Sequence, residues 1–268
     1  RCTVAGSPGA RQTWHDPAPP PEPGAVFSSI IEHYNWQAAA AVVLLTAAII
    51  KTGKYLVFRI PAIRRMRDIN IEEDNKRLAQ EKYPAMIKKG KKAGFAILFP
   101  FYFLVLPFCA TFEHVSIVRV LLEIFAILMV YDFFYYLTHR FLLHAPHDSR
   151  LGYFRRVHAV HHQARDPSWV DATYVHPLEI AIGVLLFLGT IIAHAVVAGP
   201  AHVASLVVCF LAFHMINQVN HTYFKLPYFP FRTINWIVAK HHVHHENMQK
   251  GNYATITLFY DRVFGTLD

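Results

Sequence analysis

The sequence predicts an all-α protein: a multi-pass transmembrane helical bundle of about four to five spans with a cytoplasmic, histidine-rich helical cap. Three observations lead to this fold class. Of the 268 residues, 54% are hydrophobic and only 16% are charged, whereas soluble domains carry about a quarter charged residues. The apolar residues gather in runs long enough to cross a bilayer. The 18 histidines are clustered, because the windows 139–162 and 221–245 contain 11 of them.

The N-terminal third divides into two parts. Residues 1–28 are rich in Pro, Gly and Ala without apolar periodicity, so we expect a disordered leader. Residues 29–92 would hold a first span at 36–58 and a basic cytoplasmic linker, since 13 of the 26 Lys and Arg lie between residues 51 and 92. Residues 93–268 would then form the main membrane domain, which contains the clustered histidines.

The remaining expected spans are 93–112, 120–137, 180–198 and 201–219. The first two are separated by a short polar break and the last two only by Gly199 and Pro200, so each pair is expected to form a hairpin that returns to its starting side. The lysines at 88–92 assign that side to the cytoplasm by the positive-inside rule. The histidine clusters then emerge on the cytoplasmic face of an endoplasmic reticulum or bacterial inner membrane.

Charge and cysteine content exclude other classes. The net charge of +8 arises from cations beside apolar runs, which favours a membrane-facing segment and argues against nucleic-acid binding. Three scattered cysteines provide neither a disulfide framework nor a CxxC zinc site.

The first two histidine clusters predict metal binding. His139 and His144 are five residues apart, which is about 140° on an α-helix, so they suit two neighbouring ions better than one. In the second cluster, His158 shares a helix side with both His161 and His162. His161 and His162 diverge by about 100°, so this trio can supply ligands to two ions.

The third cluster repeats this spacing with His241, His244 and His245, while His242 is an uncertain neighbour. Packing gives no reason to repeat such a spacing. Imidazole suits Fe, Zn, Cu and Ni, and the eight histidines of the three sets exceed the four ligands that one zinc needs. The sequence therefore predicts a dinuclear metal site.

At these residues the chain resembles the fatty acid hydroxylase and sterol desaturase superfamily of integral membrane oxygenases, over about residues 93–268. Besides the two HxxHH motifs, the matching elements are D-x-x-Y-Y-x-x-H-R from Asp132 to Arg140, HPLE from His176 to Glu179, Asn252-Tyr253, and D-R-V-F-G-T at 261–266. Tyr260 and Leu137 stand where many members have Trp.

The resemblance implies one further ligand, His221, on the helix before the last motif. The implied metal ligands are His139, His144, His158, His161, His162, His221, His241, His244 and His245. Asn217 stands where some members have another His, so the site has either nine histidines or a water held by Asn217. We expect supporting roles for Asp132, Arg140, His176, Glu179 and His242, such as holding a ligand imidazole or an Asp132–Arg140 pair.

The resemblance also implies a non-haem di-iron centre, with zinc as a substitute in purified protein, that uses O₂ to hydroxylate an unactivated C–H bond of a membrane lipid or sterol. No haem domain or flavin fingerprint is evident, so electrons would come from a separate donor such as a cytochrome b5 or ferredoxin with its reductase.

Three alternatives stay open at this point. A desaturase begins with the same hydrogen abstraction, and the sequence does not distinguish a hydroxylase from a desaturase. It also does not decide between sterol and fatty acyl substrates, and it does not give the oligomeric state. A membrane electron carrier would hold haem between single histidines on facing helices. A metal transporter would place ionisable ligands midway through its spans, whereas the clusters lie at the span ends.

Overall fold

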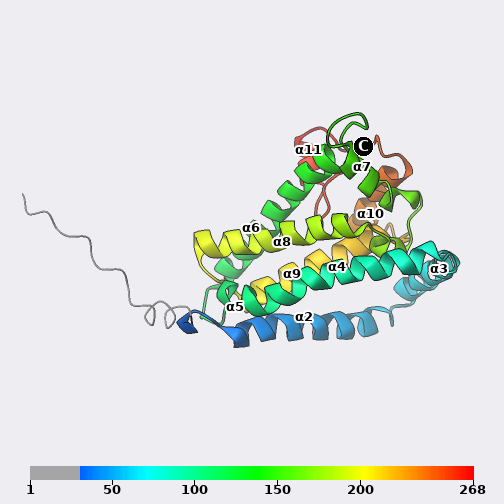
Figure 1. The fold of residues 1–268 in the computed structure, drawn as a ribbon. Coiled ribbons are helices and arrows are strands. Elements are labelled where there is room, and N and C mark those ends of the chain that lie inside the picture. Colours follow the sequence, from blue (N-terminus) through cyan, green and yellow to red (C-terminus); the bar gives the residue numbers. More distant parts are fainter. Residues whose placement is uncertain (1–30) are drawn as a thin grey trace, which may run out of the picture. The chain divides into compact units, whose positions relative to one another are not determined.

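The computed structural model describes residues 31–268, of which Asn35–Asp268 form one compact, mostly helical unit (Figure 1). The expected leader at 1–28 lies outside the described residues. The helices of the unit are α2 (Trp36–Val57), α3 (Pro61–Leu78), α4 (Lys82–Leu104), α5 (Leu106–Cys109), α6 (Ile117–Leu137), α7 (Gly152–His158), α8 (Pro177–Ala198), α9 (Val203–Asn220), α10 (Arg232–Glu246) and α11 (Phe259–Val263). A π-helix covers Thr138–Leu143, and 3₁₀ turns cover His161–Gln163 and Trp169–Thr173.

The long apolar helices begin at side-chain caps. Asn35 accepts a hydrogen bond from the Ala38 N–H at the start of α2, and Ser116 accepts one from the Arg119 N–H at the start of α6. His176 and His202 cap α8 and α9 in the same way with their Nδ1 atoms. These caps satisfy backbone donors that the helix leaves unpaired.

Within residues 31–268, three helices are long and apolar enough to cross a membrane: α2, α8 and α9. The expected span 93–112 is divided, because α4 ends at Leu104 and is followed by the short α5 and by strand β1 (Ala110–Thr111). Helix α6 covers the expected span 120–137 but carries three charged residues. The count of four to five spans and their orientation stay predictions.

The core lies between α6, α8 and α9. Phe187 of α8 is fully buried and stacks on Phe213 of α9, with ring centroids 4.3 Å apart. The Tyr131 ring of α6 meets both of these rings edge-on. This aromatic contact locks the three helices whose ends reach the histidines.

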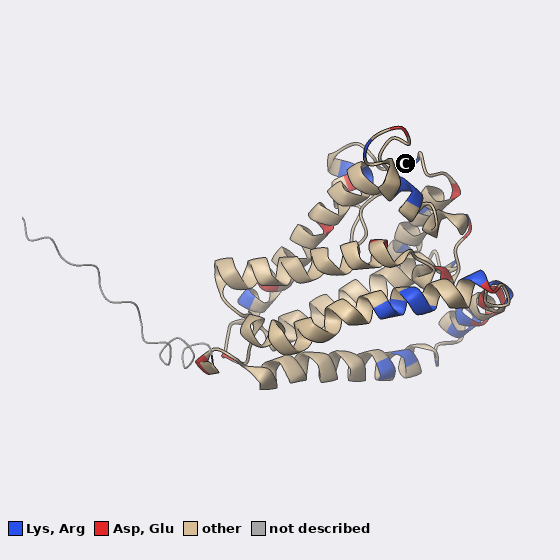
Figure 2. Ribbon diagram, viewed as in Figure 1, with Lys and Arg blue, Asp and Glu red and all other residues tan. Residues whose placement is uncertain are grey.

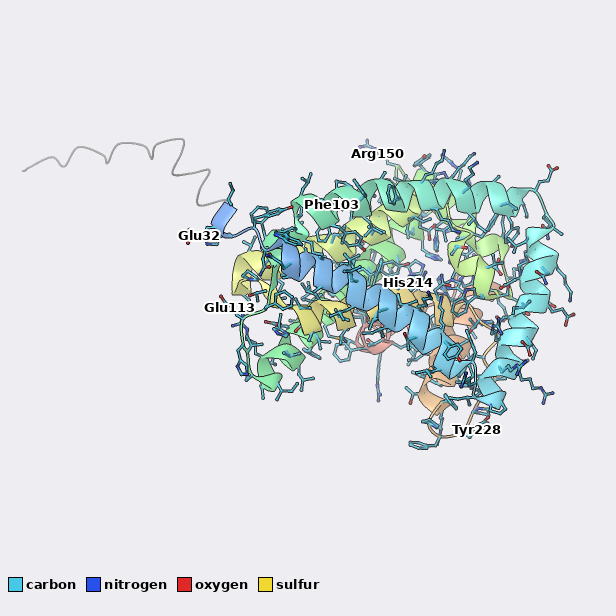
Figure 3. All side chains as sticks on the ribbon, turned by 90° about the horizontal axis from the view of Figure 1, so that it is seen from below. Glu32, Phe103, Glu113, Arg150, His214 and Tyr228 are labelled. Atoms are coloured by element: carbon cyan, nitrogen blue, oxygen red, sulfur yellow. The ribbon has the colours of Figure 1, made fainter. Side chains whose placement is uncertain are left out.

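The two ends of the bundle differ in chemistry. At one end β1 pairs in parallel with β2 (Ala201–His202), and the buried Glu123 carboxylate accepts hydrogen bonds from Ser205 Oγ and the His202 N–H. Figure 3 shows Glu113 at this end and Tyr228 at the opposite end, with His214 between them. Lys and Arg gather at the opposite end, around α3 and the neighbouring ends of α2 and α4 (Figure 2).

Candidate metal centre

The histidines form two groups at the basic end of the bundle. One group of five holds His139, His144, His158, His162 and His244, and one group of four holds His161, His221, His241 and His245. Within each group the ligand nitrogens lie within 4.8 Å of one another. The structure therefore brings together all nine histidines that the motifs and the resemblance selected, and each group could hold a metal ion.

The expectation that His139 and His144 serve different ions is wrong, because both belong to the group of five. The α-helical angle does not apply here, since residues 138–143 form a π-helix and the His144 N–H donates to the His139 carbonyl five residues earlier. Five residues of a π-helix make about one turn. The two rings consequently lie on the same side, with centroids 5.0 Å apart.

Each HxxHH trio divides between the two groups. His158 ends α7 and joins the group of five with His162, whereas His161, at the start of a 3₁₀ turn, faces the group of four. On α10, His244 joins the five and His241 and His245 join the four.

Backbone and carboxylate oxygens fix the ring orientations. Six of the nine rings donate their Nδ1–H to an oxygen, and the pairs are His139 with Tyr253 O (2.7 Å), His144 with Met248 O (2.8 Å), His158 with Glu179 Oε1 (2.8 Å), His221 with Asn217 O (2.7 Å), His244 with Gly251 O (2.8 Å) and His245 with Ala164 O (3.0 Å). A neutral imidazole has only one N–H. The Nε2 atoms of these six rings therefore carry bare lone pairs.

These bare lone pairs converge. His139 Nε2 lies 3.0 Å from His158 Nε2 and 3.2 Å from His244 Nε2. In the other group His221 Nε2 lies 3.2 Å from His245 Nε2. Two acceptors this close repel unless a cation lies between them. Two nitrogens bound at about 2.1 Å and at right angles around one ion lie about 3 Å apart, so the donor sets fit a metal in each group.

The protonation state suits metal binding as well. Burial lowers the pKa of His144 to about 3 and the pKa values of His161 and His244 to about 4. Burial also holds the pKa values of the other six imidazoles well below their usual range. All nine rings are thus neutral at physiological pH, which is the form that binds metals.

The expected supporting residues have different partners. Glu179 holds the His158 ring, as described above. The expected Asp132–Arg140 pair is not formed: Arg140 donates to the Tyr136 hydroxyl at 2.6 Å. Asp132 instead accepts four hydrogen bonds from the loop at 255–257. This loop adjoins Tyr253, so Asp132 fixes the carbonyl that orients His139.

The remaining three candidates lie around the two groups. His176 caps α8, and His242 contacts Thr222 O at 3.2 Å and Asp166 Oδ1 at 3.3 Å. Neither is a member of the two histidine groups. Asn217 orients His221 through its backbone oxygen and lines the cleft between the rings.

The sequence placed Asp261 in the closing motif without a role; in the structure it is a buried carboxylate that accepts hydrogen bonds from the N–H groups of Tyr253 and Ala254 at 2.8 Å each. Sequence reasoning missed the carbonyls of Ala164 and Met248, because a motif of side chains carries no signal for backbone acceptors.

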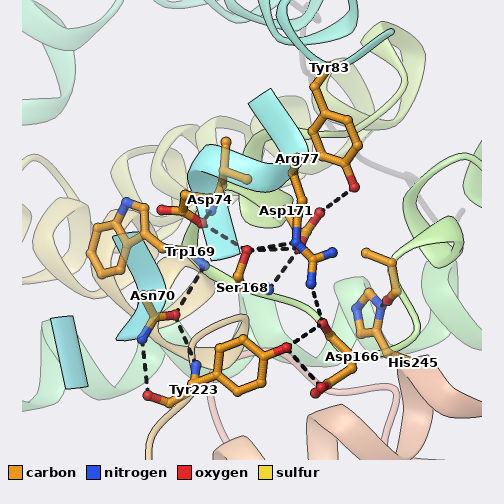
Figure 4. A network of polar contacts seen from close by, with 12 residues as sticks. Asn70, Asp74, Arg77, Tyr83, Asp166, Ser168, Trp169, Asp171, Tyr223 and His245 are labelled. Atoms are coloured by element: carbon orange, nitrogen blue, oxygen red, sulfur yellow. Dashed lines mark hydrogen bonds and ion pairs between the residues drawn. The ribbon is translucent and has the colours of Figure 1, made fainter. Parts of the chain in front are cut away.

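A polar network connects α3 to the metal centre (Figure 4). The Asn70 Oδ1 atom accepts hydrogen bonds from the backbone N–H groups of Tyr223 and Trp169. The Asp74 carboxylate accepts hydrogen bonds from Ser168 Oγ and the Val170 N–H. Arg77 pairs with the buried Asp171 at 3.0 Å and donates to Asp166 O. The segment 164–171 that these residues hold begins at Ala164, whose carbonyl orients His245.

A cavity of about 440 Å³ adjoins the group of four. It lies between α4, α6, α8 and α9 and is lined mainly by apolar side chains. Tyr135, His161, Asn217 and Thr255 line both this cavity and the cleft between the histidine rings. A molecule in the cavity therefore reaches the edge of the metal centre.

Comparison with known proteins identifies the family. Methylsterol monooxygenase 1 of Rattus norvegicus is 27% identical over 79% of this chain and 73% of its own length, and the Gallus gallus protein of the same name is 27% identical over 68% and 63%. A very-long-chain aldehyde decarbonylase of Oryza sativa subsp. indica is 33% identical over 50% of this chain and 48% of its own. No solved structure matches the chain. The family model described as fatty acid hydroxylase matches residues 124–266, from α6 to the last described motif, and the chain belongs to the fatty acid hydroxylase family.

Proposed function

We propose that this protein is an O₂-dependent di-iron oxygenase that hydroxylates an unactivated C–H bond of a membrane lipid. The observation that carries the proposal is the convergence of bare Nε2 lone pairs into two adjacent histidine groups beside an apolar cavity. In this reaction one oxygen atom of O₂ enters the C–H bond and the other leaves as water, with uptake of two electrons and two protons.

The nine histidines would hold the two ions, which when bound supply O₂ reduction and C–H oxidation. The chain's own contribution is to orient the ligand imidazoles and to exclude water. The six Nδ1–H···O bonds fix the tautomers so that Nε2 is the ligand atom. Glu179 raises the basicity of His158 by accepting its Nδ1–H. The apolar walls of the cavity keep water from the reacting carbon.

The cavity and the relatives support the choice of substrates to test. The cavity lining includes Gly94 and Gly183, which leave room for a hydrocarbon between α4 and α8. The methylsterol monooxygenases match over most of this chain, so we propose methylsterols as the first substrates to screen and fatty acyl chains as the second. We further propose four to five spans with the metal centre on the cytoplasmic side, where a separate acidic electron donor would meet the basic face.

Iron analysis and product mass test the proposal together. Purified protein loaded anaerobically with Fe²⁺ should bind two irons per chain with coupled Mössbauer signals, and a reduced, oxygenated sample should give a product 16 Da heavier than the lipid. His244→Ala should lose iron and turnover, while the exposed His147→Ala should retain both. A product 2 Da lighter would assign desaturation, and a single iron or a stable haem would refute the di-iron oxygenase.

A further inference from the structure

A second apolar cavity lies on the other side of α9, away from the metal centre. Its volume is about 670 Å³, within the range of small-molecule sites. The cavity lies between the C-terminal half of α2, α3, the C-terminal end of α9 and the start of α10. No residue of either histidine group lines it, so a ligand here would not reach the metals.

The cavity exists because α2 packs tightly at only one end. The buried residues of α2 are Ala38, Ala39 and Val42, all in its first two turns. Further along, α2 faces the cavity and not α9, through lining residues that include Ile49 and Gly53. A Cβ added at Gly53 would meet nothing within 4 Å.

The charged groups of the wall favour an anion. Most of the polar wall is already bonded: Asn70 holds Tyr223 and Trp169, and Asp74 accepts from Ser168 and Val170, as Figure 4 shows. Lys54 and Arg67 are different. Within residues 31–268 neither forms an ion pair, and their charges lie over the rings of Trp169 (5.2 Å) and Phe58 (5.0 Å).

We propose that this cavity binds one anionic phospholipid, with an acyl chain between α2 and α9 and the headgroup between Lys54 and Arg67. Lys54 lies in the last turn of α2, one of the helices long and apolar enough to cross a membrane, so a bilayer crossed by α2 would bring its headgroups to this end of the cavity. Cations beside the end of a span attract anionic lipids. The lipid would hold α2 and α3 against α9 and would stabilise the folded chain by mass action.

The test uses the full chain, stripped of lipid in a neutral detergent, with phosphatidylglycerol or phosphatidylcholine of identical acyl chains. Thermal unfolding reports stabilisation, and native mass spectrometry counts bound lipid. We expect one bound phosphatidylglycerol and a higher Tm, with little effect of phosphatidylcholine. Lys54→Gln combined with Arg67→Gln should weaken binding about 25-fold, from roughly a factor of five per cation.

A variant that fills the cavity between α2 and α9 gives a second test of the proposal. Gly53→Phe should abolish lipid retention, whereas Gly189→Phe, at an exposed helical glycine that also has open space, should bind as the unmodified chain does. Equal stabilisation by both lipids would overturn the proposal, as would a Gly53→Phe chain that retains its lipid. If Gly53→Phe does not fold, the charge variant decides alone. None of these readouts depends on iron or turnover.

Discussion

Asp132 offers the sharpest test of how the fold supports the metal centre. Its carboxylate is fully buried and accepts hydrogen bonds from the N–H groups of Thr255 (2.9 Å), Ile256 (2.8 Å) and Thr257 (3.1 Å) and from Thr257 Oγ1 (2.9 Å). In Asp132→Asn one oxygen can still serve Thr255 and Ile256, but the amide NH₂ faces the two donors of Thr257. Two charge-assisted hydrogen bonds are lost, at about 1.5–3 kcal/mol each.

Because Thr257 is only half-buried, we expect the lower end of that range, a loss of about 3 kcal/mol in the free energy of unfolding. At roughly 2–4 °C per kcal/mol this lowers Tm by about 6–12 °C. The loosened loop also carries the Tyr253 carbonyl that orients His139, so iron affinity should fall about 10–100-fold. Tyrosine and tryptophan fluorescence on heating measures the first effect, and iron retained against a chelator measures the second.

The matched control is Asp148→Asn, which makes the same chemical change at an exposed position. It should behave as the unmodified chain in both assays. If Asp132→Asn unfolds within about 2 °C of this control and retains as much iron, the loop does not depend on the carboxylate and the reasoning fails.

Three further variants test separate parts of the site. Glu179→Gln replaces one of the two oxygens that can accept the His158 Nδ1–H by an amide NH₂, so iron affinity measured by chelator competition should fall about tenfold while Tm changes little; an unchanged affinity would contradict the role given to Glu179. Arg77→Gln leaves Asp171 buried without its cation and should cost about 3 kcal/mol in denaturant unfolding, with the exposed Arg150→Gln as control; equal midpoints would contradict it. Gly183→Leu narrows the cavity beside Tyr135 and should lower kcat/KM without loss of iron, and full activity would place the substrate elsewhere.

The sequence predicted the helical class and selected eight clustered histidines because both signals are local, whereas the ninth, His221, came only from the family resemblance. Apolar runs and repeated spacings are visible in the chain itself. The trio on α10 divides between the two groups as α-helical angles suggest, whereas the first trio divides where α7 ends and a 3₁₀ turn begins. The partners of Asp132 could not be predicted this way, since they depend on how α6 packs against the loop before α11, more than a hundred residues later. Arg140 bonds Tyr136, four residues earlier, and leaves Asp132 to that loop.

The error over His139 and His144 has a specific physical cause. An α-helix assumed for residues 138–143 turns the two rings about 140° apart, and an inserted π-turn removes that angle without any change in composition. The π-turn places the His139 carbonyl against the His144 N–H, so the helix keeps its backbone bond while it gains a common face for two ligands. A spacing of four would give that face on a regular α-helix. Where ligand histidines lie five apart at the end of a span, the spacing itself is therefore a reason to expect a π-helix.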